Sequence, residues 1–308
     1  MNVLAIQHDI AWEDKQANHA TVEDMLDAAR PPQGATVVLA ELFDTGFSFN
    51  LDAIVDARTV AWGQSVAAAR SLNILCGHAE RGGASEADGA RNAGEARRAD
   101  DRTPRTTTPR GRNCLTLIAP GGVVRGRYEK VHPFTFGREG EHYGGGSRLL
   151  LRRIDGATVC PLICYDLRFP ELWRLAALAG AEVFLLGASW PAARQHHWRA
   201  LCIARAIENQ AYVVAVNRVG RDPTLAYAGG SLVVDPRGKV IAEAGDAPMT
   251  LAATLDLADL RAWRAQFPAL RDAHREFLGA IAIDDDAPSI SGRATALHDG
   301  AGGQSVVV

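Results

Sequence analysis

The sequence lacks any apolar run near the roughly 20 residues that a membrane-spanning helix needs, so we expect no membrane segment. Its start, Met1–Ile6, has no basic stretch and no cleavage-like site, which is unlike a secretion signal and favours the cytoplasm. An excess of one charge is also missing, because 33 basic and 36 acidic residues leave a net charge of −3. Such a balance provides no basic surface for nucleic acid, and we expect no nucleic-acid partner.

Cysteine is scarce, and its five residues are scattered along the chain without a CxxC pair. A zinc site or a disulfide framework would need paired spacing, so we expect no metal and no other cofactor. An odd number of cysteines fits a reduced compartment, and one of the thiols could be a nucleophile. The five are Cys76, Cys114, Cys160, Cys164 and Cys202.

The chain is long enough for a large core, with 308 residues of which 47% are hydrophobic. No linker divides it, so we expect one domain over residues 1–283. Residues 84–112 are rich in Gly, Ala, Arg, Asp and Thr, with almost nothing apolar. Such a segment buries too little surface to offset its ordering entropy, which predicts a disordered insertion in a surface loop. Residues 284–308 are similar and predict a disordered tail.

Short β-branched runs alternate with amphipathic stretches, which predicts a layered α/β fold. The turn residues Pro120–Gly122 predict a hairpin between two of the strands. Strands are predicted at Val3–His8, Thr36–Ala40, Asn73–His78, Cys114–Ala119, Val123–Tyr128, Thr158–Cys164, Val183–Leu186, Tyr212–Asn217, Gly230–Val234, Val240–Ala244 and Thr250–Leu255. Helices are predicted at Asn18–Ala29, Val60–Leu72, Pro170–Ala179, Arg194–Asn209 and Leu257–Gln266.

Cys164 stands where an apolar strand gives way to a helical pattern. A thiol at such a corner lies near backbone N–H groups, which lower its pKa and stabilise an oxyanion. The alternative is a buried structural cysteine, since most free cysteines are of that kind. The other four cysteines lie inside predicted strands or a helix and fit the structural alternative better.

Two charged residues also follow predicted strands. Glu41 comes directly after the apolar run Val37–Ala40, and Lys130 comes shortly after Val123–Tyr128. Taken alone, Glu41 is equally well explained as a solvated strand end or a helix-capping acid, and Lys130 is better explained as a solvated charge. Together with Cys164 they supply the nucleophile, proton acceptor and cation that amide hydrolysis by a thiol requires. We therefore expect these three side chains to converge at one site.

Several stretches together resemble the nitrilase, or carbon–nitrogen hydrolase, superfamily. The resemblance runs from the first strand to about Arg271, and one departure is Ala40, where the family often has proline. The stretches are Ala40–Phe43, Tyr128–His132, Cys164–Glu171, Ala188–Pro191, His197–Leu201, Ala204–Asn209, Asn217–Gly220 and Asp235–Gly238.

The resemblance implies a four-layer α-β-β-α sandwich that pairs into a homodimer or a higher homo-oligomer. It also implies that Cys164 is the nucleophile, Glu41 the general base and Lys130 the cation that stabilises the oxyanion. A second glutamate of the family is matched by Glu139, where it would position Glu41 or the substrate. Glu141 competes for that place.

Within the superfamily, the stretches Cys164–Pro170 and Ser189–Pro191 resemble the omega-amidase branch. These enzymes hydrolyse the terminal amide of 2-oxoglutaramate-like acids. Deaminated-glutathione amidases, N-carbamoyl-amino-acid amidases and nitrilases are the alternatives on the same triad. A papain-like thiol hydrolase would need a Cys–His pair that no motif supplies. An inactive binding protein would have no reason to keep three costly polar groups together.

Four more residues are candidates for substrate binding. Arg168 suits a substrate carboxylate, or else a structural ion pair with an acid such as Asp166 or Glu171. The backbone N–H of Tyr165 would join the oxyanion site. Two aromatic side chains would wall the pocket unless they only pack in the core, and these are Trp190 and Phe47. His196 and His197 lack metal partners at ligand spacing, so we expect a capping or surface role for them.

Overall fold

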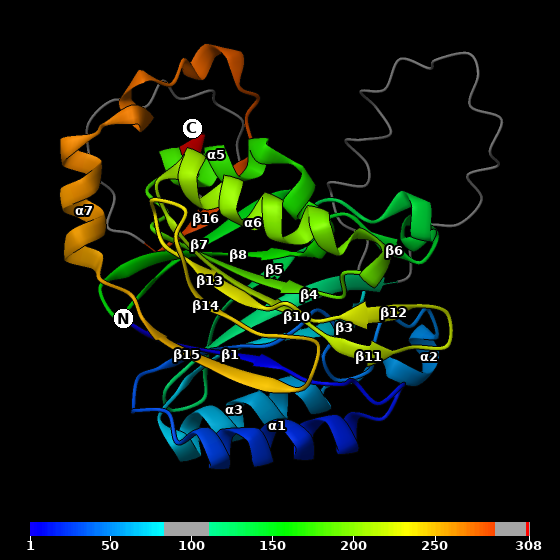
Figure 1. Ribbon diagram of the computed structural model, residues 1–308. Coiled ribbons are helices and arrows are strands. Elements are labelled where there is room, and N and C mark those ends of the chain that lie inside the picture. Colours follow the sequence, from blue (N-terminus) through cyan, green and yellow to red (C-terminus); the bar gives the residue numbers. More distant parts are fainter. Residues whose placement is uncertain (83–110, 287–305, 308) are drawn as a thin grey trace, which may run out of the picture.

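Two β-sheets packed face to face form the centre of the computed structural model, which describes residues 1–82, 111–286 and 306–307 (Figure 1). The first sheet has the order β15-β1-β2-β3-β4-β5, with β6 beside β4. Strands β1, β2 and β3 run parallel, as buried strands with helical crossovers do. Its bounds are β1 Asn2–Gln7, β2 Thr36–Val38, β3 Asn73–Arg81, β4 Gly111–Ala119, β5 Val123–Glu129, β6 Tyr143–Gly144 and β15 Met249–Thr254.

The second sheet has the order β14-β13-β10-β9-β8-β7-β16-β17. Strands β8, β9 and β10 are parallel, and all residues of β9 and β10 are buried. Its bounds are β7 Arg148–Ile154, β8 Ala157–Ile163, β9 Val183–Ala188, β10 Tyr212–Asn217, β13 Leu232–Val234, β14 Val240–Glu243, β16 Ala282–Asp285 and β17 Val306–Val307. A separate pair, β11 Val219–Arg221 and β12 Ala226–Ala228, extends to one side (Figure 1).

Helices cover the outer face of each sheet. Figure 1 shows α1 (Lys15–Ala29) and α3 (Arg58–Arg70) below the first sheet, and α5 (Pro170–Leu178) and α6 (Gln195–Asn209) above the second. The short α2 (Leu51–Ile54) lies near β3. This arrangement confirms the predicted α-β-β-α sandwich. Helix α5 shows the local cause, because a proline at its first turn starts it and one apolar face buries Leu172 and Trp173.

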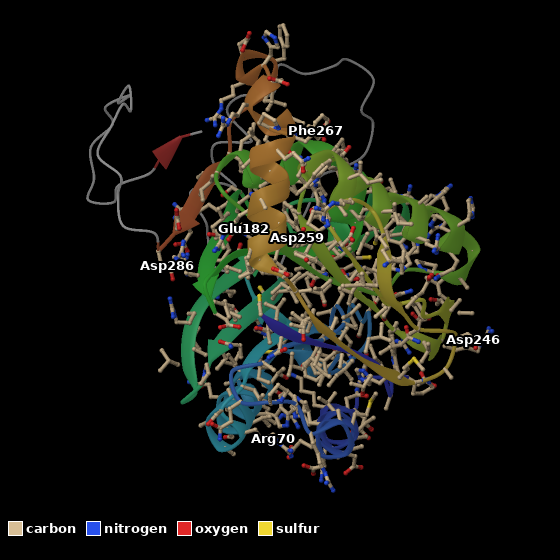
Figure 2. All side chains as sticks on the ribbon, turned by 60° about the vertical axis from the view of Figure 1, so that its left-hand side comes forward. Arg70, Glu182, Asp246, Asp259, Phe267 and Asp286 are labelled. Atoms are coloured by element: carbon tan, nitrogen blue, oxygen red, sulfur yellow. The ribbon has the colours of Figure 1, made fainter. Side chains whose placement is uncertain are left out.

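Helix α7 (Leu257–Gln266) follows β15 and stands at the side of the molecule, with Asp259 near one end and Phe267 at the other (Figure 2). Arg261 on this helix pairs with Glu182 at 2.7 Å, and Leu260 is buried. Within the part of the chain that the structure describes, no helix has both the length and the apolar character to cross a membrane.

The predicted elements are all present, with ends that shift by a few residues. Strand β7 was missed because its arginines hide the strand pattern, and Arg152 is held by the carbonyl oxygen of Arg125 and by Asp284. The ends of both predicted disordered segments lie in strands: Gly111 and Arg112 begin β4, and β16 includes residues 284–285. Pairing with β3 and β7 orders them whatever their composition. The rest of both segments, apart from 286 and 306–307, lies outside the described residues.

Candidate active site

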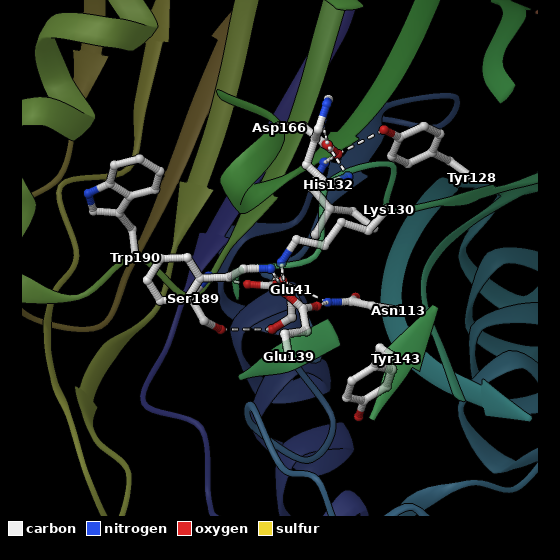
Figure 3. Close-up of polar contacts among 12 residues, drawn as sticks. Glu41, Asn113, Tyr128, Lys130, His132, Glu139, Tyr143, Asp166, Ser189 and Trp190 are labelled. Carbon is white, nitrogen blue, oxygen red and sulfur yellow. Dashed lines mark hydrogen bonds and ion pairs between the residues drawn. The ribbon is translucent and has the colours of Figure 1, made fainter. Parts of the chain in front are cut away.

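The ends of three strands bring Glu41, Lys130 and Cys164 together, as the sequence predicted. Glu41 lies just beyond β2, Lys130 directly follows β5, and Cys164 directly follows β8. Figure 3 shows Lys130 reaching between Glu41 and Glu139, with its Nζ 2.7 Å from Glu41 Oε1 and 2.8 Å from Glu139 Oε2. All three of these charged side chains are almost fully buried, so their charges interact with little screening.

The Glu41 carboxylate is held by donors on both oxygens. Asn113 Nδ2 donates to Oε1 at 2.7 Å, and the backbone N–H of Ser189 donates to Oε2 at 3.0 Å. Ser189 Oγ also donates to the backbone oxygen of Glu41 at 3.1 Å. The next residue, Leu42, has a φ of 46°, a sharp turn that few non-glycine residues adopt. The carboxylate is therefore fixed in position as well as buried.

Glu139, and not Glu141, lies in this cluster. Its Oε2 accepts from the backbone N–H of Phe134 at 2.6 Å, and its Oε1 accepts from Asn113 Nδ2 at 2.9 Å. Burial and the nearby Glu41 charge raise the pKa of Glu139, while Lys130 opposes that rise. Glu141 is exposed and pairs with Arg138 on the surface.

Cys164 sits on a strained corner, with a φ of 42° at the start of a 3₁₀ turn, Cys164–Arg168, which precedes α5. Burial and the Glu41 carboxylate raise the pKa of its thiol well above the usual value. Lys130 and a hydrogen bond with the Ser189 backbone act in the opposite direction. Because the thiol pKa is raised overall, the resting thiol is protonated and needs a base to become a nucleophile.

Lys130 keeps its proton in this setting. Burial disfavours its charge, but Glu139 and Glu41 outweigh that effect and raise the pKa of Lys130 well above its usual value. The ring of Phe47 lies 5.4 Å from Lys130 Nζ. The site therefore holds a permanent cation beside a protonated thiol.

Two glycines let the backbone around Glu41 pass between neighbouring strands. A Cβ on Gly77 of β3 would lie 2.5 Å from the backbone oxygen of Ala40. A Cβ on Gly187 of β9 would lie 2.7 Å from the backbone oxygen of Leu39. Gly187 belongs to the second sheet and Leu39 follows a strand of the first, so this is where the two sheets approach closely at the site.

Asp166 links the turn that begins at Cys164 to the residues around Lys130. Its Oδ2 accepts from Tyr128 Oη at 2.8 Å and from the Ile163 N–H at 3.2 Å. Its Oδ1 accepts from the His132 N–H at 3.0 Å, and His132 Nδ1 lies at the same distance (Figure 3). A fully buried carboxylate thus links β5, the residues after it, and the turn that begins at Cys164.

A cavity of about 420 Å³ opens over these groups. Glu41, Lys130 and Cys164 line it, together with all four residues predicted to bind substrate, which are Phe47, Tyr165, Arg168 and Trp190. Arg168 makes no ion pair with Asp166 or Glu171. Its guanidinium stacks 4.7 Å from the Trp190 ring, and its Nη2 lies 3.2 Å from His197 Nδ1. His196 is exposed.

The sequence reading missed several residues of this site. Asn113 bridges Glu41 and Glu139, and the only signal was an amide within the buried run of β4. Arg194 also lines the cavity, and no sequence motif indicated a role for it in the site. Among the residues that the structure describes, no group of three or more His, Cys, Asp or Glu side chains is placed to hold a metal ion.

The family model described as carbon–nitrogen hydrolase matches residues 2–265. The chain belongs to the carbon–nitrogen hydrolase family. It is 34% identical over 275 residues to omega-amidase YafV of Escherichia coli K12, covering 89% of this chain and 96% of that protein. It is 30% identical over 278 residues to the 2-oxoglutaramate amidase of Bacillus subtilis, covering 89% of this chain and 98% of that protein.

Solved structures of this superfamily share the fold. XC1258 of Xanthomonas campestris, a superfamily protein described with an arsenic adduct in its active site, superposes with a TM-score of 0.76 at 30% identity. That match covers 89% of this chain and 97% of the other. A variant of an amidase from Nesterenkonia sp. AN1, with acrylamide added to its active-site cysteine, gives a TM-score of 0.70 at 25% identity. It covers 90% of this chain and all of the other, 100%. These relatives place the chain among amidases.

Proposed function

We propose that this amidase hydrolyses the terminal amide of a small carboxylate-bearing acid, converting 2-oxoglutaramate to 2-oxoglutarate and ammonia. The observation that carries the proposal is a buried lysine fixed between two carboxylates beside a buried thiol, at the floor of a cavity. The names of the full-length relatives favour the omega-amidase reaction among those that the cluster can perform.

In the first half of the reaction, Glu41 takes the proton of the Cys164 thiol as sulfur attacks the amide carbon. The raised pKa of the thiol makes this base necessary. Lys130 Nζ and the backbone N–H of Tyr165 stabilise the oxyanion, an interaction worth about 10²–10³ in rate for each donor. Glu41 then returns the proton to the leaving nitrogen, the C–N bond breaks, and ammonia departs. The acyl group remains bound to Cys164 as a thioester.

In the second half, Glu41 takes a proton from water, which attacks the thioester carbon. The C–S bond breaks, the carboxylic acid departs, and the proton held by Glu41 returns to the sulfur. Glu139 keeps Lys130 in place throughout, because its carboxylate contacts the ammonium directly. Arg168 binds the carboxylate of the substrate, and Trp190 and Phe47 form walls of the pocket.

The other reactions open to this triad are nitrile hydrolysis, N-carbamoyl cleavage and hydrolysis of deaminated glutathione. A nitrile first adds the thiol to give a thioimidate, which takes up water and releases ammonia before the thioester forms, and an N-carbamoyl acid also yields carbon dioxide. Product analysis with each substrate therefore separates them from the omega-amidase reaction.

The test is ammonia release from 2-oxoglutaramate by the wild-type protein and by Cys164→Ala, with Cys160→Ala as the matched control. Cys160 is a buried thiol of β8, the strand that directly precedes Cys164, and lies outside the cavity lining. We expect turnover by the wild type and the control and none by Cys164→Ala. Full activity of Cys164→Ala would refute the mechanism, and inactivity of the wild type would refute the substrate.

We also propose a single domain over residues 1–283, a cytoplasmic location and a homodimer. Five free, buried cysteines support a reducing compartment. Light scattering on the purified protein tests the dimer, and fractionation of cells tests the location.

A further inference from the structure

The lining of the cavity includes two arginines, of which the proposed mechanism uses only Arg168. Arg168 ends the turn after Cys164, and Arg194 ends another short turn, η4 (Ala192–Arg194), just before α6. Both are half-buried. Within residues 1–82, 111–286 and 306–307, neither guanidinium lies within ion-pair distance of an acid, whereas Lys130 contacts two.

The acids of the cavity do not neutralise this pair. Glu41 is engaged by Lys130. Asp222 accepts hydrogen bonds from the N–H groups of Thr224 and Leu225 and from Tyr227 Oη. Burial lowers the pKa of Arg218, and the Asp222 charge offsets part of that effect. Partly buried cations without counter-ions are costly, and a bound anion removes that cost.

Aromatic rings hold the two guanidinium groups in place. Arg168 lies over Trp190, while Arg194 lies 5.3 Å from the Phe134 ring centre and 5.9 Å from that of Phe136. Burial lowers the pKa of Arg168, and the nearby positive charge of Arg194 lowers it further. Arg168 remains protonated at neutral pH, because the ordinary arginine pKa is so high.

Helix α6 begins next to this pair of arginines. This helix starts at Gln195, directly after Arg194, and has no acidic residue in its first turn. The unpaired N–H groups of a helix start favour an anion nearby.

We propose that Arg168 and Arg194 together form a subsite for the carboxylate of the amide substrate, with Arg194 as the residue that sets specificity. This inference rests on the proposed function and deepens it. The cavity then has two ends: a reacting end at Cys164, Glu41 and Lys130, and an anion end at the two arginines. It selects amides that carry a carboxylate at the other end of a short chain, over uncharged amides of the same length.

The test compares glutaramate with pentanamide, which has the same chain length and no charge. Arg194→Met keeps much of the apolar stem over Phe134 and Phe136 while removing the charge. Arg199→Met is the matched control, because Arg199 lies exposed on α6, outside the cavity lining, and pairs with Glu243. We expect Arg194→Met to lower kcat/KM for glutaramate by about 10- to 100-fold, mainly through KM, and to leave pentanamide unchanged.

Equal losses on both amides, or no loss on glutaramate, would overturn the inference. A second measurement is independent of turnover: calorimetric binding of glutaramate to Cys164→Ala protein with and without Arg194→Met. Weaker binding without the arginine supports the subsite even if the wild type releases no ammonia, in which case only the proposed function fails. Selective hydrolysis of pentanamide would leave the amidase function standing and refute the subsite.

Discussion

At the scale of single residues, the cluster is defined by which atoms donate and which accept. Every contact described for the Glu139 carboxylate comes from a donor: Lys130 Nζ, Asn113 Nδ2 and the Phe134 N–H. A glutamine at that position would have to turn its own NH₂ group toward one of them. A side chain of the same shape is therefore not enough at position 139, because both of its terminal atoms must accept hydrogen bonds.

We expect Glu139→Gln to lower kcat by about 10²-fold or more and to cost about 1–3 kcal/mol of stability, because Lys130 loses a charge partner and two donors oppose each other. Glu141→Gln, on the exposed side of the same turn, should change neither. Steady-state kinetics and urea unfolding measure both effects. Wild-type kcat in Glu139→Gln would show that the second carboxylate has no part in catalysis.

At the scale of elements, the site depends on a close approach between strands of the two sheets, which a glycine permits. Gly187 on β9 allows the second sheet to approach the backbone beside Glu41, and Ser189, two residues later, then donates to the Glu41 carboxylate. The position of the base is thus set by a strand of the opposite sheet.

Gly187→Ala should move Glu41 relative to Cys164 and lower kcat by about 10-fold or more, with a stability loss of about 1–3 kcal/mol. The added Cβ would lie 2.7 Å from the Leu39 backbone oxygen, which cannot move as a flexible side chain does. Gly140→Ala is the control, because its Cβ would lie 4.0 Å from the nearest atom. Steady-state kinetics and thermal unfolding of the two variants measure both effects. Equal kcat and equal stability of the two variants would show that the close approach at Gly187 does not position Glu41.

At the scale of the whole molecule, the stability of the fold at low pH depends on a buried, neutral histidine. His8 follows β1 and is fully buried, with Nε2 3.3 Å from the Phe43 backbone oxygen. Burial lowers its pKa from 6.5 to about 4. The unfolded chain therefore binds a proton at a higher pH than the folded protein, so stability is lost as the pH falls from 6.5 toward 4.

Between about pH 7 and about pH 5, we expect His8→Gln to lose less stability than the wild type, by on the order of 2 kcal/mol. Burial also lowers the pKa values of His19 and His78, so part of the pH dependence should persist in the variant. Urea unfolding at the two pH values measures the difference. A variant at the exposed His196 is the control, and an identical pH dependence in His8→Gln would refute the assignment.

Sequence alone predicts the alternation of strands and helices, the layered α/β class and the three strand ends that carry Glu41, Lys130 and Cys164. These features depend on local periodicity and turn residues, which each segment carries on its own. Long-range contacts decide that Glu139 and not Glu141 reaches Lys130 and that Asn113 bridges two carboxylates. They also place Arg168 and Arg194 in one cavity lining, with no acid at ion-pair distance among the residues that the structure describes. Those facts depend on contacts between residues far apart in the chain, and a pattern within one segment does not specify its distant partner.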